Sequence, residues 1–304
     1  PGFYLEIFPG AKILISKSGK LISYSPVNFL GNENDNIHIY SDVNSQGLSV
    51  INANGVSNIN YVKFSDLGNI NHAGIINTGS INFYNSDINI KNSIIENADA
   101  EDAINIIHSK FLIDNLKIIN SKSDAIDLDF SNGIIKNSFF INNGNDGIDI
   151  SAGNVKLENV NINKSGDKGI SIGEKSSVYL NFAKINNSFI GLAVKDQSKL
   201  SVDNENIQSL NEGLMIKNSE YGIALYQKKS EFGPSEVHIG DTGNHYLNLE
   251  FENVNDQFVV EENSYLRIGP LNITDYNKNV YEFLYPKWKK NIDMKKNLLL
   301  KMII

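Results

Sequence analysis

The sequence contains no cysteine in its 304 residues, which excludes disulfide bonds and thiolate metal sites. Arginine is also scarce: Arg267 is the single arginine among 27 basic residues, and the net charge is −8. Nucleic-acid binding needs a basic surface that usually contains arginine, so this charge balance argues against a nucleic-acid partner. No apolar run approaches the roughly 18 residues of a membrane-spanning helix, and no transmembrane segment is expected.

A leader sequence is missing as well. The chain begins at Pro1 without Met, and it shows no charged and apolar leader that ends in small residues. We therefore expect a mature or cropped chain, in which an export signal would not be visible. A long β-repeat needs no disulfide, so the lack of cysteine is compatible with an extracellular or cell-envelope location.

Asparagine and isoleucine are the abundant residues. The sequence has 46 asparagines and 42 isoleucines, together more than a quarter of the chain. Isoleucine suits the interior of stacked strands, and asparagine suits tight turns and side-chain ladders. The composition therefore favours β-strands that are joined by polar turns.

A short segment recurs five times without gaps, each copy beginning 22 residues after the previous one. The copies are 102–106, 124–128, 146–150, 168–172 and 190–194. A second series places asparagine at one bend of each repeat, with Phe182 as an interruption: Asn92, Asn115, Asn137, Asn159 and Asn204. A fixed period of this length predicts a solenoid, with one supersecondary unit per turn and a core shared by neighbouring turns.

The repeat is too short for a strand, a crossover helix and their loops, and signals for helix starts and stops are missing. We therefore predict an all-β chain, a single-stranded right-handed parallel β-helix with about 22 residues per rung and three faces per turn. The expected parts are opening rungs in 1–56, regular rungs in 57–226, an inserted loop in 227–247, closing rungs in 248–285 and a basic, apolar tail in 286–304. The tail is interpreted as a cap or a fragment of a following segment, with an amphipathic membrane-surface helix as the alternative.

Several motifs together resemble the right-handed parallel β-helix domains of bacterial proteins that carry a spore-coat-kinase-like (CotH-type) domain. The motifs are 79–86, 101–106, 123–130, 144–151, 166–174 and 226–234, and the resemblance covers roughly residues 1–270. The wider superfamily includes pectate-lyase-like and other carbohydrate-active β-helices. His108 departs from the pattern, which has arginine at that position. The resemblance implies the fold and implies no established reaction for this subgroup.

Strand alternation predicts which side chains point away from the core. Each copy sends two apolar residues into the core, such as Ile126 and Leu128, so the residue between them and the residue after them face outward, in two columns. The columns are Asn105, Asp127, Asp149, Ser171 and Ala193, and Ile107, Asp129, Ser151, Gly173 and Lys195. Two carboxylates one rung apart, about 4.8 Å, repel by roughly 3.5 kcal/mol at an effective dielectric near 20. Asp127, Asp129 and Asp149 therefore favour a counter-charge, a bound cation or a raised pKa.

Three kinds of chemistry fit this acidic triad. Ca²⁺, the one cofactor suggested, would take carboxylate oxygens from Asp127, Asp129 and Asp149. A Ca²⁺-assisted polysaccharide lyase would also need a base, for which Lys168 and Lys195 are the candidates. A glycoside hydrolase would use a carboxylate pair such as Asp127 and Asp149. The predicted catalytic residues are Asp127, Asp149 and Lys195, and the predicted ligand-binding residues are Asp129, Lys168, Glu174, Tyr226, Gln227 and Lys228.

Structural roles compete with these functions. Asp102, Asp124 and Asp146 precede Gly or Ala and are interpreted as turn residues that cap backbone N–H groups. The outward aspartates can also serve only to keep an exposed face soluble. His108 has no partner of its own kind in its column, and catalysis by this histidine is not expected. Tyr226 and Gln227 stand where the inserted loop begins, so they bind a ligand or simply end a strand.

Two functional hypotheses remain from the sequence. The first is an exported β-helix module of a bacterial envelope or surface protein, which binds a polysaccharide or other domains of the same protein. The second is a Ca²⁺-dependent lyase or a glycoside hydrolase acting on the acidic face. We favour the first for two reasons: the single arginine, Arg267, is far from the aspartates, and residues 100–200 contain no inserted loop that could wall a groove.

Overall fold

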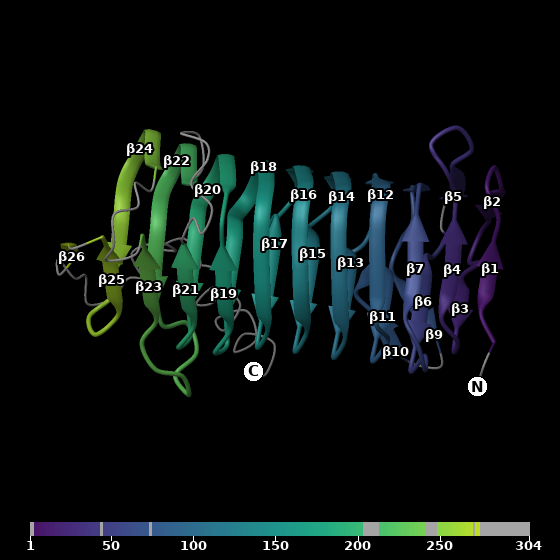
Figure 1. Ribbon diagram of the computed structural model, residues 1–304, viewed down its shortest axis with the longest axis horizontal. Helices are drawn as coiled ribbons and strands as arrows, with labels where there is room; N and C mark the ends of the chain where they lie inside the picture. Colours follow the sequence, from purple (N-terminus) through teal and green to yellow (C-terminus); the bar gives the residue numbers. More distant parts are fainter. Residues whose placement is uncertain are drawn as a thin grey trace, which may run out of the picture.

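The computed structural model describes residues 3–42, 45–72, 75–202, 213–240, 248–269 and 271–273. Its regular structure in these ranges is entirely β, and the strands stack along one long axis (Figure 1). Neighbouring rungs pair in parallel, as in β13 (Asp102–Ile107) with β15 (Asp124–Asp129). The predicted fold class, a right-handed parallel β-helix, is confirmed. Among the described residues, no helix has the length and hydropathy to cross a membrane.

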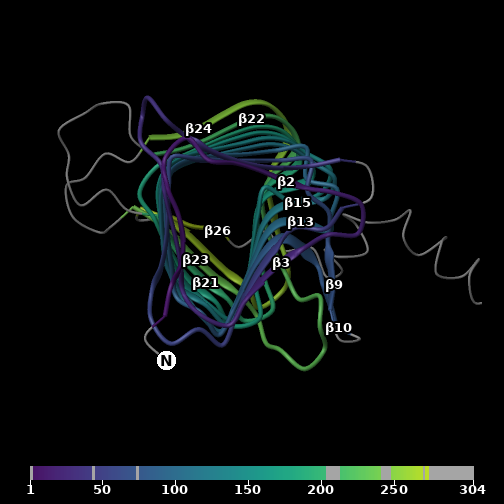
Figure 2. The ribbon, with the colours of Figure 1, turned by 90° about the vertical axis from the view of Figure 1, so that its right-hand side faces the viewer.

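Each turn has three faces around a common interior (Figure 2). The face that carries the aspartate columns is called the aspartate face. Its strands are β3 (Leu21–Ser23), β6 (Leu48–Ile51), β11 (Gly79–Tyr84), β13, β15, β17 (Ile148–Ser151) and the last parts of β18 (Asn154–Gly173), β20 (Ala183–Lys195), β22 (Gly213–Tyr226) and β24 (Asn248–Val260).

The other two faces are built from short strands at the ends of the molecule and from long, bent strands in its middle. The second face contains β2 (Lys12–Ile15), β5 (Ile37–Ser41), β8 (Val62–Ser65) and parts of β12 (Ile88–Glu96), β14 (Lys110–Ser121), β16 (Asn132–Asn143), β18, β20, β22 and β24. The third contains β1 (Leu5–Ile7), β4 (Val27–Leu30), β7 (Ser57–Asn60), parts of β12, β14, β16 and β18, and then β19 (Ser177–Leu180), β21 (Lys199–Val202), β23 (Glu236–Ile239), β25 (Tyr265–Ile268) and β26 (Leu271–Ile273).

The core is a set of apolar columns inside the coil. Ile104, Ile126 and Ile148 pair in register on successive strands and are fully buried. The column continues through Ile170 and Leu192. β-Branched side chains pack well on pleated strands, so identical residues on adjacent rungs fill the interior without gaps. This is the packing that the alternation in the sequence predicts.

Asparagine holds the bend between the third and second faces. Asn92, Asn115, Asn137 and Asn159 all have positive φ angles, which asparagine tolerates better than most residues. Their side chains also connect the rungs: Asn115 Nδ2 donates to Asn92 Oδ1 at 2.9 Å, and Asn159 Nδ2 donates to Asn137 Oδ1 at 2.9 Å. The same residue type therefore meets the backbone and the hydrogen-bonding requirement of this bend. Asn204 lies outside the described residues.

Two expectations about irregular segments need correction. The expected regular rungs in 57–226 are interrupted, because β9 (Ile70–His72) and β10 (Ile75–Asn77) pair antiparallel as a hairpin beside the coil. Within the expected loop 227–247, residues 236–239 form β23 and continue the third face between β21 and β25. The described irregular part is therefore 227–235. The tail 286–304 lies outside the described residues, and the remaining segment boundaries stay predictions.

Replacing Asn137 separates its two structural roles. Asn137→Ala loses the side-chain hydrogen bonds to Asp114 and Asn159. Alanine also tolerates the left-handed conformation less well than asparagine, so the free energy of unfolding should fall by about 1–3 kcal/mol. Asn137→Gly loses the same hydrogen bonds but adopts a positive φ without strain, and should cost less. Urea unfolding followed by circular dichroism measures both variants. Equal or reversed losses would contradict the role given to the backbone conformation.

Candidate active site on the aspartate face

Strand register brings the predicted acidic residues together. Asp127 pairs with Asn105 on one side and with Asp149 on the other, and Asp149 pairs with Ser171. Asn105 Nδ2 donates to Asp127 Oδ2 at 2.9 Å. The first outward column predicted from the sequence is thus confirmed in these rungs, and it puts two carboxylates one rung apart.

Two lysines lie against the carboxylates from the following rungs. Lys168 and Lys195 are each only 6% exposed. Lys195 Nζ lies 3.6 Å from Asp149 Oδ1 and donates to Ser171 Oγ. Lys168 Nζ lies 3.4 Å from Asp146 Oδ1 and also pairs with Asp167. Lysines lie next to aspartates because equivalent positions of the 22-residue repeat hold aspartate in the earlier rungs and lysine in the later ones, as Asp146 and Lys168 do.

Asp124 and Asp146 have the capping role that the sequence predicts. Asp124 Oδ1 accepts a hydrogen bond from the backbone N–H of Asp146 at 2.7 Å, and Asp146 Oδ1 accepts one from the N–H of Lys168 at 2.9 Å. Asp102 instead accepts a side-chain hydrogen bond from Asn105 Nδ2 at 3.4 Å. The separation of these turn aspartates from the outward ones is wrong in one respect: Asn105 touches both Asp102 and Asp127, so the two sets form one electrostatic cluster.

The two stacked carboxylates have opposite pKa shifts. Burial, together with repulsion from Asp102 and Asp129, raises the pKa of Asp127 to about 9. Burial acts in the same direction on Asp149, but the Lys195 ammonium and a hydrogen bond from Ser171 outweigh it and lower the pKa of Asp149. At neutral pH, Asp127 is therefore protonated and Asp149 is ionised. Burial also raises the pKa of Asp129, with a further contribution from the neighbouring Asp149.

The lysines differ in their capacity to act as bases. Burial lowers the pKa of Lys168, but Asp146 outweighs it and the net pKa is raised, so this lysine holds its proton. The side chain of Lys228 is exposed, but partial burial of its ammonium group and the positive charges of Lys195 and Lys168 lower its pKa. Lys228 is therefore a better base candidate than Lys168, one of the two lysines that the sequence singled out.

Two excursions bound the open part of the aspartate face. Residues 227–235 approach its later rungs: Lys229 pairs with Glu174, and Asp196 Oδ1 accepts hydrogen bonds from the backbone N–H groups of Lys228 and Lys229. The hairpin β9–β10 lies over the opening rungs, where Tyr24 Oη and His72 Nε2 are 3.2 Å apart (Figure 2). The segments that border this face therefore lie outside residues 100–200, which weakens one reason against an enzyme.

The later rungs of this face are covered, contrary to the expected exposure of every outward residue. Ala193, Ala224 and Tyr226 are buried and form a second apolar cluster on the outer side of the sheet with Ile190, Tyr221 and Val259. Tyr226 is thus not an exposed ligand-binding residue. Gln227 holds the following loop, because its Nε2 donates to the carbonyl of Lys229 at 3.1 Å. The accessible part of the face lies on β13, β15 and β17.

Calcium binding by the aspartates gains no support from the geometry. Within the ranges that the structure describes, no three acidic or histidine side chains converge as a metal site requires. Lys195 instead supplies the positive charge next to Asp149. Asp127, Asp129 and Asp149 remain a hypothetical Ca²⁺ site only on the strength of their residue type.

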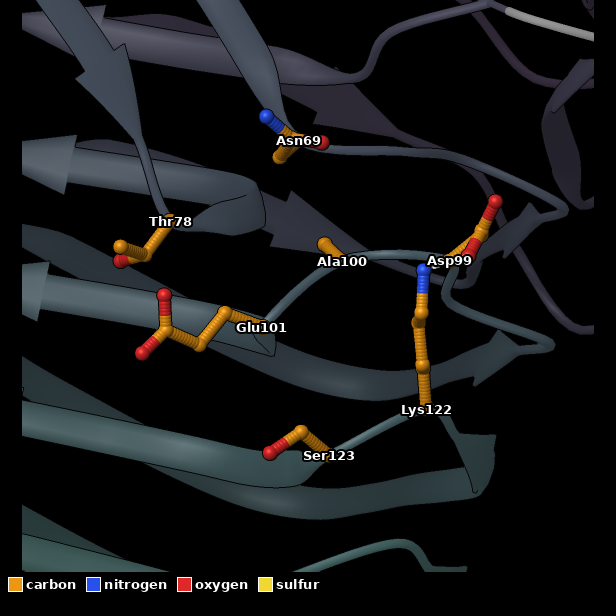
Figure 3. A pocket seen from close by; sticks show the side chains of 7 residues that line it. All are labelled: Asn69, Thr78, Asp99, Ala100, Glu101, Lys122 and Ser123. Carbon is orange, nitrogen blue, oxygen red and sulfur yellow. Dashed lines mark hydrogen bonds and ion pairs between the residues drawn. The ribbon is translucent and has the colours of Figure 1, made fainter. Parts of the chain in front are cut away.

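A polar hollow opens where the strands of this face begin. Its volume is about 470 Å³, and it lies at the turns that lead into β13 and β15 (Figure 3). Its lining residues are Asn69, Thr78, Asp99, Ala100, Glu101, Lys122 and Ser123. Lys122 Nζ pairs with Asp99 Oδ1 at 2.7 Å, and Glu101 is the charged lining residue that makes no ion pair with the described residues. The sequence holds no signal for this hollow, because its residues belong to irregular turns with no repeat pattern.

An aromatic strip borders the other end of the same strands. His108 stacks on Phe130 with ring centroids 4.8 Å apart at 19°, and Tyr84 meets His108 edge-on at 6.3 Å. The expectation that His108 has no partner in its column is wrong, since it stacks on Phe130. The signal was present in the spacing, since Phe130 follows His108 by one 22-residue repeat.

The comparisons with known proteins find similar structures but no close relative. No protein-family model matches the chain, and no curated protein matches it. A bacteriophage CBA120 tailspike domain has 11% identity and a TM-score of 0.49, over 86% of this chain and 48% of that one. The catalytic domain of a GH87 α-1,3-glucanase has 11% identity and a TM-score of 0.40, over 91% of this chain and 64% of that one. An alginate lyase from Paenibacillus has 12% identity and a TM-score of 0.34, over 87% of this chain and 93% of that one.

The chain thus spans about half the length of the tailspike domain and less than two thirds of the glucanase domain. At these low identities we transfer no residue role from any of the three proteins to this chain.

Asp127→Asn should make the protein more stable at alkaline pH. Below pH 4, Asp127 is protonated in both the folded and the unfolded chain; as pH rises toward 9, only the unfolded chain ionises, so the free energy of unfolding falls. Asparagine removes this loss, and the variant should exceed the parent at pH 8 by at least about 1 kcal/mol and equal it near pH 4.

Chemical unfolding at the two pH values measures this difference. Asp35→Asn, at an exposed turn, is the control and should change stability equally at both pH values. A variant that is less stable than the parent at pH 8 would contradict the protonated state assigned to Asp127.

Proposed function

We propose that the aspartate face is the active site of a glycoside hydrolase, with Asp127 as general acid and Asp149 as nucleophile. The observation that carries this proposal is the register of β15 and β17, which stacks Asp127 directly on Asp149. Adjacent strands lie about 4.8 Å apart. Retaining glycosidases hold their two carboxyl groups about 5–5.5 Å apart, so one rung of this coil supplies a suitable separation.

The environments of the two carboxylates support the division of roles. A retaining hydrolase needs one protonated and one ionised carboxyl group at the same pH, and divergent pKa values are the usual sign of that division. Asp127 has a pKa raised to about 9 by burial and neighbouring carboxylates. Asp149 is held ionised beside Lys195, which positions the carboxylate without touching the sugar.

The reaction follows from these states. Asp127 donates its proton to the glycosidic oxygen while a carboxylate oxygen of Asp149 attacks the anomeric carbon, so that the glycosidic bond breaks and a glycosyl ester forms. The Asp127 carboxylate then takes a proton from water, and the hydroxide attacks the same carbon and releases Asp149. Both carboxyl groups return to their starting states, and the anomeric configuration is retained.

A passive binding module is less well supported than it was from the sequence alone. The argument from the distant Arg267 does not hold, since Lys168 and Lys195 supply basic groups that contact Asp146 and Asp149. The expected lack of walls does not hold either, because residues 227–235 reach Glu174 and Asp196. A binding module would not need a pair of neighbouring carboxyl groups of which Asp149 is ionised and Asp127 is protonated.

A polysaccharide lyase is the second candidate, because Lys228 offers a base. Burial and two neighbouring lysines lower its pKa, and Lys228 lies at the start of the segment that borders the face. A calcium-assisted version would need a metal cluster that the described residues do not form. The hydrolase reading uses only groups whose protonation states agree with their roles.

The setting of the module is also a proposal. We infer an exported β-helix module of a bacterial envelope or surface protein, which rests on the resemblance of segments such as 123–130 and 144–151 to β-helix domains of CotH-type proteins. The polysaccharide or neighbouring domains of a larger envelope protein would be its partners.

Asp127→Asn and Asp149→Asn should each lower kcat on a glycan substrate by about 10²–10⁴-fold, because each removes one of the two groups that act on the bond. Asp129→Asn should have a smaller effect, since Asp129 lies beside the pair rather than in it. A panel of neutral and acidic polysaccharides, assayed for new reducing ends, identifies the substrate. Activity of the parent should fall as pH rises through about 9, where Asp127 loses its proton.

Product analysis separates the candidates. Proton NMR should show retained anomeric configuration, and a chelator should leave the rate unchanged because Lys195 replaces a metal beside Asp149. An unsaturated, ultraviolet-absorbing product would establish the lyase instead. A panel on which the parent is inactive, or on which both asparagine variants keep full activity, would exclude the hydrolase.

A further inference from the structure

Three aromatic rings stand exposed on successive rungs at the edge of the aspartate face. Phe130 is 51% exposed and Tyr84 is 42% exposed, with the exposed His108 between them. His108 and Phe130 are nearly parallel, and Tyr84 closes the row edge-on. A contiguous exposed aromatic surface usually marks a binding site, since exposing it to water is unfavourable.

The backbone at these positions favours a different residue. His108 and Phe130 have φ angles of 50° and 51°, in the left-handed region. At many other bends of the coil an asparagine has this conformation, as at Asn115 and Asn137, although Tyr61 and Ala152 also adopt it. Bulky side chains are uncommon there, because the Cβ approaches the carbonyl oxygen, and they persist where another requirement outweighs the strain. Stability of the bend therefore does not account for the two rings.

The strip is continuous with the proposed catalytic pair. The backbone N–H of His108 donates to the carbonyl of Asp129 at 3.0 Å, and Asp129 follows Asp127 by two residues on the same side of β15. A ligand that lies on the rings is therefore next to Asp129 and, two residues further along β15, to Asp127.

The chemistry of the strip and of its surroundings selects one class of ligand. The C–H faces of a pyranose ring are apolar and carry partial positive charge, so they pack on the negative faces of aromatic rings. Rungs repeat every 4.8 Å or so, which is similar to the length of one sugar unit. The acidic group next to the rings is the half-exposed Asp129, whereas Lys168 and Lys195 are buried and paired with Asp146 and Asp149, and Lys229 is paired with Glu174. An anionic sugar would be repelled along this edge.

We propose that Tyr84, His108 and Phe130 form a platform that binds consecutive sugar rings of a linear, uncharged glycan running along the axis of the coil beside Asp127 and Asp149. This inference deepens the proposed hydrolase and rests on it for the choice of a glycan. It assigns the substrate class, a neutral polysaccharide rather than a polyuronate, and the direction in which the chain lies.

Replacing the rings by asparagine tests the platform without damaging the bend. Phe130→Asn introduces the residue that the chain uses at its other left-handed bends, so the thermal unfolding midpoint should stay the same or rise. Its affinity for uncharged oligosaccharides, measured by calorimetry on the Asp127→Asn background to prevent cleavage, should fall at least about tenfold. His108→Asn should act in the same direction.

Phe139→Asn is the matched control. Phe139 is 41% exposed on the second face, and its partner on the next rung is already an asparagine, Asn161. This variant should bind like the parent. The platform would be overturned if Phe130→Asn bound uncharged oligosaccharides as tightly as the parent, if no uncharged oligosaccharide bound at all, or if oligouronates bound more tightly than uncharged ones.

The platform and the hydrolase can fail separately. Binding that depends on Phe130, in a parent protein that cleaves no glycan, would keep the platform and exclude the hydrolase. Cleavage that depends on Asp127 and Asp149, with KM unchanged in Phe130→Asn, would keep the hydrolase and exclude the platform.

Discussion

The constraint on which this structure depends is the in-register stacking of identical positions at the spacing of one β-strand. Parallel pairing places each residue directly against its equivalent one rung away, as Ile126 lies between Ile104 and Ile148. For apolar side chains this repetition builds a core, and for asparagine it builds hydrogen bonds between bends. For aspartate the same repetition brings like charges within one rung, which is unfavourable unless something neutralises them.

The aspartate face answers that repulsion in two ways. Lys195 neutralises Asp149, and protonation neutralises Asp127. Two chemically identical side chains in one column thereby acquire opposite protonation states, which is what acid–nucleophile catalysis requires. The stacking that the repeat imposes therefore also produces the pair of protonation states that a hydrolase needs. Next to it, the aromatic strip supplies the apolar surface that a sugar ring needs and that a charged column lacks.

The 22-residue period made the fold and the outward columns of the aspartate face predictable. Asp127, Asp149 and Ser171 are spaced by 22 residues in the sequence, and parallel pairing places them on adjacent strands. The hairpin β9–β10 was not predictable, since Ile75 and Ile76 are as apolar as the residues of a rung strand and only tertiary packing distinguishes them. The covered end of the face was missed for a related reason: alternation tells which side of a strand a residue occupies but not what lies above it, and Tyr226 is buried on the outer side. Opposite pKa values depend on partners in three dimensions, so a column of aspartates alone could not reveal them.

Carbon-13 NMR titration of the aspartate carboxyl carbons tests the central claim most directly. With Asp127→Asn and Asp149→Asn used to assign the two resonances, we expect Asp127 to remain protonated at pH 7 and to titrate near 9, while Asp149 stays ionised throughout the range above pH 4. Two carboxyl groups that are both ionised at pH 7 would contradict the account, because the column would then lack an acid.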